Sequence, residues 1–377
     1  MKTKGYFALA GLLILALISA CQPAWAIIIE SERGNVLFDK SDFEKYKKEF
    51  TNTEICPGLP LNYILYRSSI EVVESATFKD TAGNKEELDW QKSGEKVCLD
   101  EKGKISLGNR KLPSNSIKID EAPAGDELFS ILDIAPTVLS ALGIGYENLP
   151  GKTLVEGQFD HVALIFLDGF GYIKYHQALE NGLLKNLSQG VAAEKAVTVY
   201  PPRTSVASAA ILTGLPPTEN GIYETGIRKT EAATIFDLTS SSGLKSIAVE
   251  GESLAFNLRD TEVILSGDRD LNGSTDDNVF SNAEDVIKTN MPDLLWIHFH
   301  GIDDSGHSFG PDSEQVNRKI IEIDSYYGKI INMLPENTLT IAFADHGMHL
   351  VNEEGRVGNH GNLIYDDMVI PVFVETK

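Results

Sequence analysis

The stretch HVALIFLDGFG (residues 161–171) decides the fold of this 377-residue chain. It opens with a short, almost wholly apolar run, which Asp168 and Gly169 follow directly. Similar runs recur further along, at residues 246–250, 294–299, 338–343 and 368–374. Longer stretches with helical periodicity separate them, at residues 205–212, 282–289 and 313–334. This alternation predicts an α/β fold in which helices sandwich a mostly parallel sheet.

Acidic residues stand just after three of these runs, at Asp168, Asp303 and Asp345. In such sheets the carboxyl ends of the strands form the edge at which ligands bind. Six of the eight histidines lie between His298 and His360. Imidazoles and carboxylates together suit zinc or a similar divalent ion, and burying them unpaired would be costly. The sequence therefore predicts a metal site at this edge.

Five motifs carry a resemblance to a known family. They are FLDGF (166–170), Thr204 ten residues before the glycine of ILTG (211–214), DDSGHSFGP (303–311), DHGM (345–348) and GNHG (358–361). Each is weak alone, but all five stand in the family's order. The chain resembles the alkaline phosphatase superfamily, and within it most closely the type I phosphodiesterases and nucleotide pyrophosphatases.

The resemblance implies a site for two divalent metal ions, zinc or alternatively manganese. Around the first ion it places Asp168, Thr204, Asp345 and His346. Around the second it places Asp303, His307 and His360. Asp304 competes with Asp303, but the spacing of four residues before the motif histidine favours Asp303. Thr204 would be the nucleophile and form a phosphothreonine intermediate, because a metal-bound hydroxyl loses its proton more readily than a free one.

The surroundings of Thr204 depart from the family pattern. Ala207 stands where phosphodiesterase relatives have an asparagine that holds a phosphate oxygen. The expected replacement is Arg203, Ser205, Ser208 or the backbone amide of Ser205, and His349 is a further expected substrate contact. Arg203 would suit a dianionic monoester, so the choice between monoester and diester stays open. Thr204 itself has an alternative interpretation as the N-cap of the helix at 205–212.

The order of the elements departs from the family as well. Residues 130–144 resemble the helix that usually follows the last metal-ligand histidine, yet here they precede Asp168. We hypothesise a circular permutation, which is easy when the original termini lie close together. It requires residues 128–142 to pack on the same sheet as 161–167 and 368–374. Residues 120–377 would then form the catalytic domain, with 120–158 as its permuted C-terminal part.

These features favour a metal-dependent hydrolase of phosphate esters, whether diester, pyrophosphate or monoester. The alternatives are a phosphonate or sulfate ester hydrolase on the same scaffold, and a non-catalytic, metal-stabilised surface lipoprotein. The formal net charge of -22 disfavours nucleic acid as a partner. We therefore expect a small phosphoester substrate.

Residues 1–26 are typical of an export signal, because Lys2 and Lys4 precede an apolar stretch at 6–20. Residues 18–21 (ISAC) resemble a lipobox, in which Cys21 would carry the lipid. Alternatively, the signal is cleaved after residues 24–26 (AWA), or residues 27–29 extend an uncleaved anchor. All three predict an exported protein that is secreted or held at the cell surface.

The short apolar runs and turn clusters of residues 27–119 predict an irregular, partly β accessory region with a helix near 41–50. Its two cysteines, Cys56 and Cys98, would form a disulfide in an oxidising compartment, the alternative being two unrelated buried thiols. The sequence of this region indicates no particular function.

Three further sets of polar residues have competing interpretations. Oxygen ligands recur at alternate positions from residue 268, as in a calcium loop formed by Asp268, Asp270, Asn272 and Asp276. Val279 replaces the usual twelfth-position glutamate, which favours a plain polar turn. His298 and His300 share one strand face and are expected to pack rather than to bind metal. Asp324 is expected to be a structural helix residue.

Overall fold

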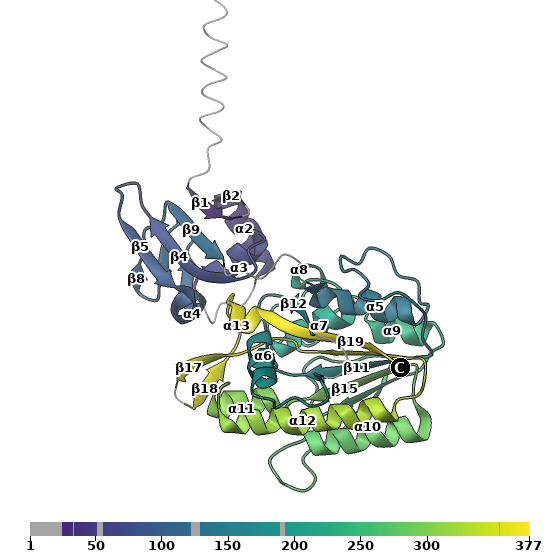
Figure 1. Cartoon of the computed structure of the whole chain (residues 1–377). Helices are drawn as coiled ribbons and strands as arrows, with labels where there is room; N and C mark the ends of the chain where they lie inside the picture. Colours follow the sequence, from purple (N-terminus) through teal and green to yellow (C-terminus); the bar gives the residue numbers. More distant parts are fainter. Residues whose placement is uncertain (1–24, 33, 51–55, 122–128, 189–192, 354) are drawn as a thin grey trace, which may run out of the picture. The chain divides into compact units, whose positions relative to one another are not determined.

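The computed structural model describes residues 25–32, 34–50, 56–121, 129–188, 193–353 and 355–377. Most of the predicted signal, including Cys21, lies outside these residues. The chain divides into two compact units (Figure 1). One runs to Ile64 and resumes over Ser75–Asp120, and the other comprises Leu65–Glu74 and Glu121–Lys377.

The first unit is built on two small sheets. The larger has the order β2 (Gly34–Asp39), β1 (Ala26–Ser31), β9 (Ser116–Glu121), β4 (Val73–Lys79), β5 (Lys85–Asp89). The smaller has the order β3 (Leu59–Pro60), β6 (Val97–Leu99), β7 (Ile105–Leu107), β8 (Arg110–Lys111). Its helices are α2 (Lys40–Glu49), α3 (Leu61–Arg67) and α4 (Trp90–Ser93). The predicted helix near 41–50 is confirmed as α2, which Asp39 and Asp42 begin with a reciprocal capping box.

Strand β1 corrects the interpretation of residues 27–29 as part of an uncleaved anchor. Ile27 and Ile29 are 1% exposed, whereas Ile28 between them is 39% exposed. This alternation is that of a strand with one face on a core, and β1 pairs with both β2 and β9. Within the described ranges, no helix is long and apolar enough to cross a membrane.

A disulfide joins Cys56 to Cys98 in the first unit, and the predicted pairing is thus confirmed. The bond ties the segment before β3 to β6, across a sequence separation of 42 residues. Such a link reduces the conformational freedom of the unfolded chain.

We expect reduction of this disulfide to destabilise the first unit by about 2–5 kcal/mol. Calorimetric melting with and without reductant measures the effect. The second unit contains neither cysteine, so its transition is the internal control. Equal shifts of both transitions would contradict the assignment of this stabilisation to the first unit.

The second unit holds an eight-stranded sheet that confirms the predicted fold class. Its order is β10 (Phe129–Ser130), β12 (Glu194–Val197), β19 (Val369–Thr376), β16 (Thr338–Phe343), β11 (His161–Leu167), β15 (Leu294–Phe299), β13 (Ser246–Glu250), β14 (Glu262–Leu265). Strand β19 runs antiparallel to both of its neighbours, β12 and β16. All other neighbouring pairs in this sheet are parallel. Four of the five predicted runs coincide with strands, and the fifth corresponds to β19 with ends shifted by one and two residues.

Helices cover both faces of this sheet (Figure 1). On one face lie α10 (Asp276–Asn290), α11 (Gly301–Phe309) and α12 (Glu314–Met333). On the other lie α5 (Ile134–Ala141), α7 (Thr204–Thr213) and α9 (Ile235–Ser241). Further elements of this unit are α6 (Tyr172–Glu180), α8 (Pro217–Asn220), α13 (Tyr365–Met368) and the hairpin β17 (His349–Glu353) with β18 (Arg356–Asn359). The central strands are buried on both faces, which explains their unbroken apolar runs.

Two structural predictions concern the packing around this sheet. Strand β10 pairs with β12, and α5 belongs to the same apolar core as β11, so the packing that a circular permutation requires is present. The permutation itself stays a prediction. Asp324 on α12 accepts the backbone N–H groups of Lys185, Asn186 and Leu187, which confirms its structural role.

Candidate functional site

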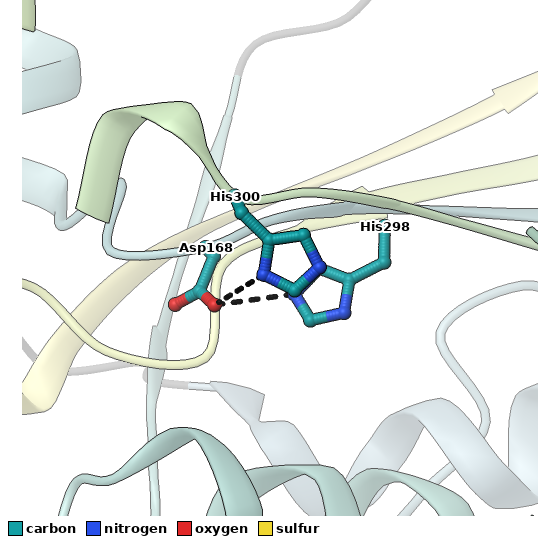
Figure 2. A group of neighbouring side chains, drawn as sticks. All are labelled: Asp168, His298 and His300. Atoms are coloured by element: carbon teal, nitrogen blue, oxygen red, sulfur yellow. Dashed lines mark hydrogen bonds and ion pairs between the residues drawn. The ribbon is translucent and has the colours of Figure 1, made fainter. Parts of the chain in front are cut away.

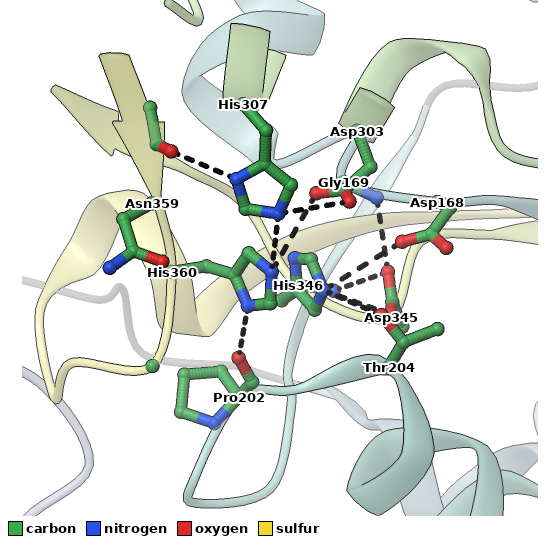
Figure 3. A network of polar contacts seen from close by, with 12 residues as sticks. Asp168, Gly169, Pro202, Thr204, Asp303, His307, Asp345, His346, Asn359 and His360 are labelled. Atoms are coloured by element: carbon green, nitrogen blue, oxygen red, sulfur yellow. Dashed lines mark hydrogen bonds and ion pairs between the residues drawn. The ribbon is translucent and has the colours of Figure 1, made fainter. Parts of the chain in front are cut away.

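The structure brings the seven predicted metal-site residues together at one edge of the sheet (Figure 3). Asp168 directly follows β11, and Asp345 and His346 follow β16. The others come from α7, α11 and the end of β18, namely Thr204, Asp303, His307 and His360.

Gly169 allows the β11 turn to approach α11 closely. Its φ is +73°, in the left-handed region that favours glycine, and an added Cβ would lie 2.9 Å from the Cβ of Asp303. The N–H of Gly169 also donates to Asp345 Oδ1 at 3.1 Å. The glycine of the FLDGF motif therefore joins three carboxylate-bearing segments.

The first group of side chains surrounds Nε2 of His346 (Figure 3). This nitrogen lies 3.1 Å from Asp345 Oδ2, 3.7 Å from Asp168 Oδ1 and 3.3 Å from Thr204 Oγ1. Thr204 is the first residue of α7, and Arg203 occupies the N-cap position. The N-cap interpretation of Thr204 is therefore wrong, because its hydroxyl faces the imidazole and not the helix amides.

The second group surrounds Nε2 of His307. Asp303 and His307 are four residues apart on α11, so they share a helix face. His307 Nε2 lies 3.2 Å from Asp303 Oδ2 and 3.2 Å from His360 Nε2. His360 Nε2 in turn lies 3.7 Å from Asp303 Oδ1. The ring of His346 stacks on that of His360, with centroids 3.6 Å apart, so the two groups adjoin.

Backbone carbonyls orient all three imidazoles. Nδ1 of His346 lies 3.0 Å from Gly347 O, and Nδ1 of His307 lies 2.8 Å from Gly358 O. Nδ1 of His360 lies 2.8 Å from Pro202 O. A carbonyl only accepts, so each Nδ1 carries a proton and each Nε2 is the atom free to bind a cation.

The carboxylates present the matching partners for a cation. One buried oxygen of each of Asp168, Asp303 and Asp345 has no hydrogen-bond partner among the residues that the structure describes. Burial and the nearby charge of Asp168 raise the pKa of Asp345 well above its usual value. Burial and the neighbouring His346 lower the pKa of His360 well below its usual value. This set of imidazole nitrogens and unpaired carboxylate oxygens fits divalent cations such as zinc or manganese.

A second layer behind Asp168 involves His298, His300 and a glutamate, Glu250, that sequence reasoning missed. His298 Nε2 lies 3.2 Å and His300 Nδ1 3.5 Å from the same Asp168 oxygen (Figure 2). On the far side, Glu250 Oε2 lies 2.9 Å from His298 Nδ1 and 3.5 Å from His300 Nε2. These contacts give both histidines polar partners in addition to the expected packing, in which His298 stacks on Phe166.

The charge of Glu250 depends on these imidazoles. Burial alone would raise its pKa, but the paired His298 and His300 outweigh burial and lower the pKa to about 2. Trp296 Nε1 donates a hydrogen bond to the other carboxylate oxygen of Glu250, Oε1, at 2.7 Å. Glu250 ends β13, so the strand-end rule that singled out Asp168 applies to it as well.

We expect Glu250→Gln to destabilise the protein by about 3–5 kcal/mol, because breaking a buried charged pair leaves its partner uncompensated. The amide offers a single acceptor oxygen for two donors, Trp296 and His298. Urea unfolding gives the free energy. Glu284→Gln on α10 removes a half-exposed pair with Lys288 and should cost under about 1 kcal/mol. Similar losses in both variants would contradict the role given to Glu250.

Asp276 is not arranged as a calcium-loop ligand, which supports the favoured interpretation of this loop as a plain polar turn. It is fully buried, and its two oxygens accept the backbone N–H groups of His300 and Gly301 at the start of α11. Asp268, Asp270 and Asn272 are instead held by hydrogen bonds within their own turn. The loop is a polar turn, and Asp276 anchors the helix that carries Asp303.

His349 does not contact the expected substrate position. It is 3% exposed, and its Nδ1 lies 2.8 Å from Asp367 Oδ1. Asp367 also accepts the N–H groups of Gly361 and Asn362, which follow His360. Both residues therefore belong to the support of the His360 loop.

A pocket of about 330 Å³ opens beside the two groups. Arg203 and Ser205 line it, as expected of substrate contacts, whereas His349 is not among its described lining residues. Ser205 is 1% exposed, and its hydroxyl oxygen has no hydrogen-bond partner. The lining comprises Asp168, Arg203, Thr204, Ser205, Thr225, Arg228, Ser253, Leu254, Ala255, His300, Asp303, Asp304, His307, Arg356 and His360.

The chain is similar to several known proteins. A stretch of the GPI ethanolamine phosphate transferase 3 of Schizosaccharomyces pombe is 32% identical over 108 residues, 29% of this chain and 11% of that protein. Venom phosphodiesterase 2 of Crotalus adamanteus is 26% identical over 233 residues, 54% of this chain and 29% of that protein. The chain thus spans less than a third of the length of either relative.

Among solved structures, murine ectonucleotide pyrophosphatase/phosphodiesterase 5 is 16% identical, with a TM-score of 0.46 over 58% of this chain and 88% of that one. The phosphonoacetate hydrolase of Sinorhizobium meliloti is 17% identical, with a TM-score of 0.42 over 52% of this chain and 58% of that one.

The sequence profile of the family described as type I phosphodiesterase / nucleotide pyrophosphatase matches residues 162–260 and 255–368. These ranges cover more than half of the chain and contain all seven clustered residues. The resemblance inferred from the five motifs is confirmed. The chain belongs to the type I phosphodiesterase / nucleotide pyrophosphatase family of the alkaline phosphatase superfamily.

Proposed function

We propose that this protein is an exported, metal-dependent hydrolase of phosphate esters that binds two divalent ions. The observation that carries the proposal is the set of three buried carboxylate oxygens without hydrogen-bond partners, which face oriented imidazoles beside the Thr204 hydroxyl. Such a set is costly to bury unless a cation binds there.

Asp168, Thr204, Asp345 and His346 would hold one ion, and Asp303, His307 and His360 the other. When bound, the ions would neutralise phosphate charge and make the Thr204 hydroxyl and a water molecule more acidic. His346 orients the Thr204 hydroxyl at 3.3 Å, and Asp276 and Asp367 hold the segments that carry Asp303 and His360. These residues position the reactants and supply little chemistry of their own.

Thr204 would perform the reaction in two displacements. Its Oγ1 attacks phosphorus, and the bond from phosphorus to the leaving oxygen breaks. Water then cleaves the phosphothreonine, and phosphate or a monoester leaves with the threonine restored. The start of α7 favours this placement, since N-terminal amides and the Ser205 hydroxyl can bind phosphate oxygens.

The proposal is tested by measuring the hydrolysis of three esters: nitrophenyl phosphate, bis-nitrophenyl phosphate and nitrophenyl sulfate. Each ester is assayed with zinc, with manganese and without added metal. We expect cleavage of at least one phosphate ester that depends on added metal, and little cleavage of the sulfate. Preferential sulfate hydrolysis would favour the sulfatase alternative. No hydrolysis with any metal would favour a metal-stabilised surface protein.

Transfer is a second candidate function, which the match to the GPI ethanolamine phosphate transferase favours. The same phosphothreonine could pass its phosphoryl group to an alcohol instead of water. Product analysis in the presence of glycerol or ethanolamine distinguishes the two functions. A phosphorylated alcohol in large excess over free phosphate would favour transfer.

We also propose that the chain is exported as a lipoprotein modified at Cys21. Trp25 supports cleavage ahead of Cys21 over cleavage after Ala26, which would remove that tryptophan. Its ring lies 5.9 Å from that of Phe43, and its Nε1 donates to Glu101 O at 3.0 Å. Cys21→Ser should move the protein from the membrane fraction to the soluble exported fraction. An unchanged membrane fraction would contradict lipidation.

A further inference from the structure

Three arginines from separate segments line the pocket beside Thr204. Arg203 directly precedes α7, Arg228 lies between α8 and α9, and Arg356 is the first residue of β18. This concentration is unexpected in a chain with 33 basic and 55 acidic residues. A chance distribution would give such a pocket more carboxylates than guanidinium groups.

The arginines in the pocket differ from Arg110, Arg259 and Arg318 in their partners. Arg110, Arg259 and Arg318 each pair with a carboxylate, that of Glu86, Asp237 and Glu314 respectively. No described carboxylate lies within ion-pair distance of Arg203 or Arg228. Arg228 instead donates through Nη1 to Leu254 O at 3.0 Å, and Arg356 donates to Asn359 Oδ1 at 3.1 Å.

These contacts orient the guanidinium groups without neutralising them. A guanidinium has five N–H donors, so a single bond to Leu254 O leaves most of those of Arg228 available. Its fork geometry matches carboxylate and phosphate oxygens. Of the three carboxylates that line the pocket, Asp168 and Asp303 face the proposed ion sites. Only the exposed Asp304 remains to oppose three positive charges.

The other lining residues limit the size and character of a ligand. Leu254 and Ala255 are the apolar ones, and no Phe, Tyr or Trp is among the described lining residues. A nucleobase or an acyl chain binds mainly through aromatic and apolar contacts. The pocket volume of about 330 Å³ is also near the lower end for small-molecule sites.

We propose that the substrate is a compact phosphoester whose leaving group carries a second anionic group, a carboxylate or a phosphate, which Arg228 binds together with Arg203 and Arg356. This inference rests on the proposed function, because it names the substrate class of that same site. A protein with this preference for an anionic leaving group differs from an enzyme that releases a neutral alcohol or an amine.

Three esters that share a two-carbon leaving group test this inference. Phosphoglycolate carries a carboxylate, 2-hydroxyethyl phosphate is neutral at that position, and phosphoethanolamine carries an ammonium group. We expect kcat/KM to fall in that order, with about tenfold or more between the first two, as for a hydrogen-bonded charge pair. Equal values for all three would overturn the inference.

The arginine variant separates this effect from the intrinsic reactivity of the esters. Arg228→Gln should lower the ratio of kcat/KM for phosphoglycolate over 2-hydroxyethyl phosphate by about tenfold. Arg318→Gln, which removes an exposed arginine paired with Glu314 outside the pocket, should leave the ratio unchanged. A ratio that Arg228→Gln does not alter would also overturn the inference.

Calorimetric titration of metal-loaded Thr204→Ala distinguishes failure of the inference from failure of the proposed function. Tighter binding of phosphoglycolate than of 2-hydroxyethyl phosphate supports the inference even if wild type hydrolyses neither ester. Hydrolysis of the esters without preference in rate or binding leaves the proposed function standing and overturns the inference. Absence of both hydrolysis and binding overturns both.

Discussion

Thr204→Ala is expected to lower phosphate ester hydrolysis by about 10³-fold or more, because it removes the atom that attacks phosphorus. The hydroxyl lies 3.3 Å from His346 Nε2 at the start of α7, and a helix N-terminus favours the binding of phosphate. Steady-state kinetics with nitrophenyl phosphate measures the loss. Acid quenching followed by peptide mass spectrometry should find phosphothreonine at position 204 in wild type and not in the variant.

Thr213→Ala is the matched control, since it removes a threonine hydroxyl from the other end of α7. Thr213 Oγ1 donates to Ala209 O, so we expect a stability loss of about 1 kcal/mol and normal kcat. Thr204→Ser should retain part of the activity, because it keeps the nucleophilic oxygen. Full activity in Thr204→Ala would exclude Thr204 as the nucleophile.

Removal of divalent ions is expected to abolish hydrolysis and also to destabilise the second unit. Ions at 100 to 1,000 times their Kd would stabilise the folded state by about 3–4 kcal/mol, which chelation removes. Without cations, burial and then the nearby charge of Asp168 disfavour the ionised form of Asp345, which raises the pKa of its carboxyl well above the usual value. Thermal melting with and without chelator measures the effect.

Several controls make this prediction specific. Re-addition of zinc or manganese should restore activity and stability together, and elemental analysis should count two ions per chain. Asp345→Asn should lose one of the two. The melting of the first unit, which contains the Cys56–Cys98 disulfide, should not respond to chelator. Unchanged melting of the second unit after complete metal removal would contradict a cation site.

The central strands were predictable with their boundaries because both of their faces are buried. An unbroken apolar run is then both necessary and visible, as in β11, β13, β15 and β16. Strands β10 and β12 have two and four residues, too few for a periodic pattern, and were missed. The antiparallel direction of β19 has no local signal, since it results from where the chain enters the sheet.

The candidate site likewise contains residues that a sequence rule predicts and residues that it does not. Asp168 and Asp345 follow the ends of β11 and β16, and Asp303 lies on α11 just after β15, so a sequence rule predicts that they meet. The family motifs add Thr204 and the histidines. Such rules do not identify a residue whose role is to hold another segment of the chain in place. Asp276 matches a calcium loop in local spacing, yet its carboxylate holds the start of α11, 24 residues away.

The sequence by itself determined the fold class, the edge of the sheet that carries the site and the seven residues gathered there, because short apolar runs and motif spacing encode them locally. Only the tertiary structure decided which atoms face the site. It oriented the imidazoles of His307 and His360 through the backbone carbonyls of Gly358 and Pro202, placed Glu250 behind Asp168 and brought Arg203, Arg228 and Arg356 around one pocket. These relations depend on long-range packing, in which burial forces each polar group to find a partner wherever the fold supplies one.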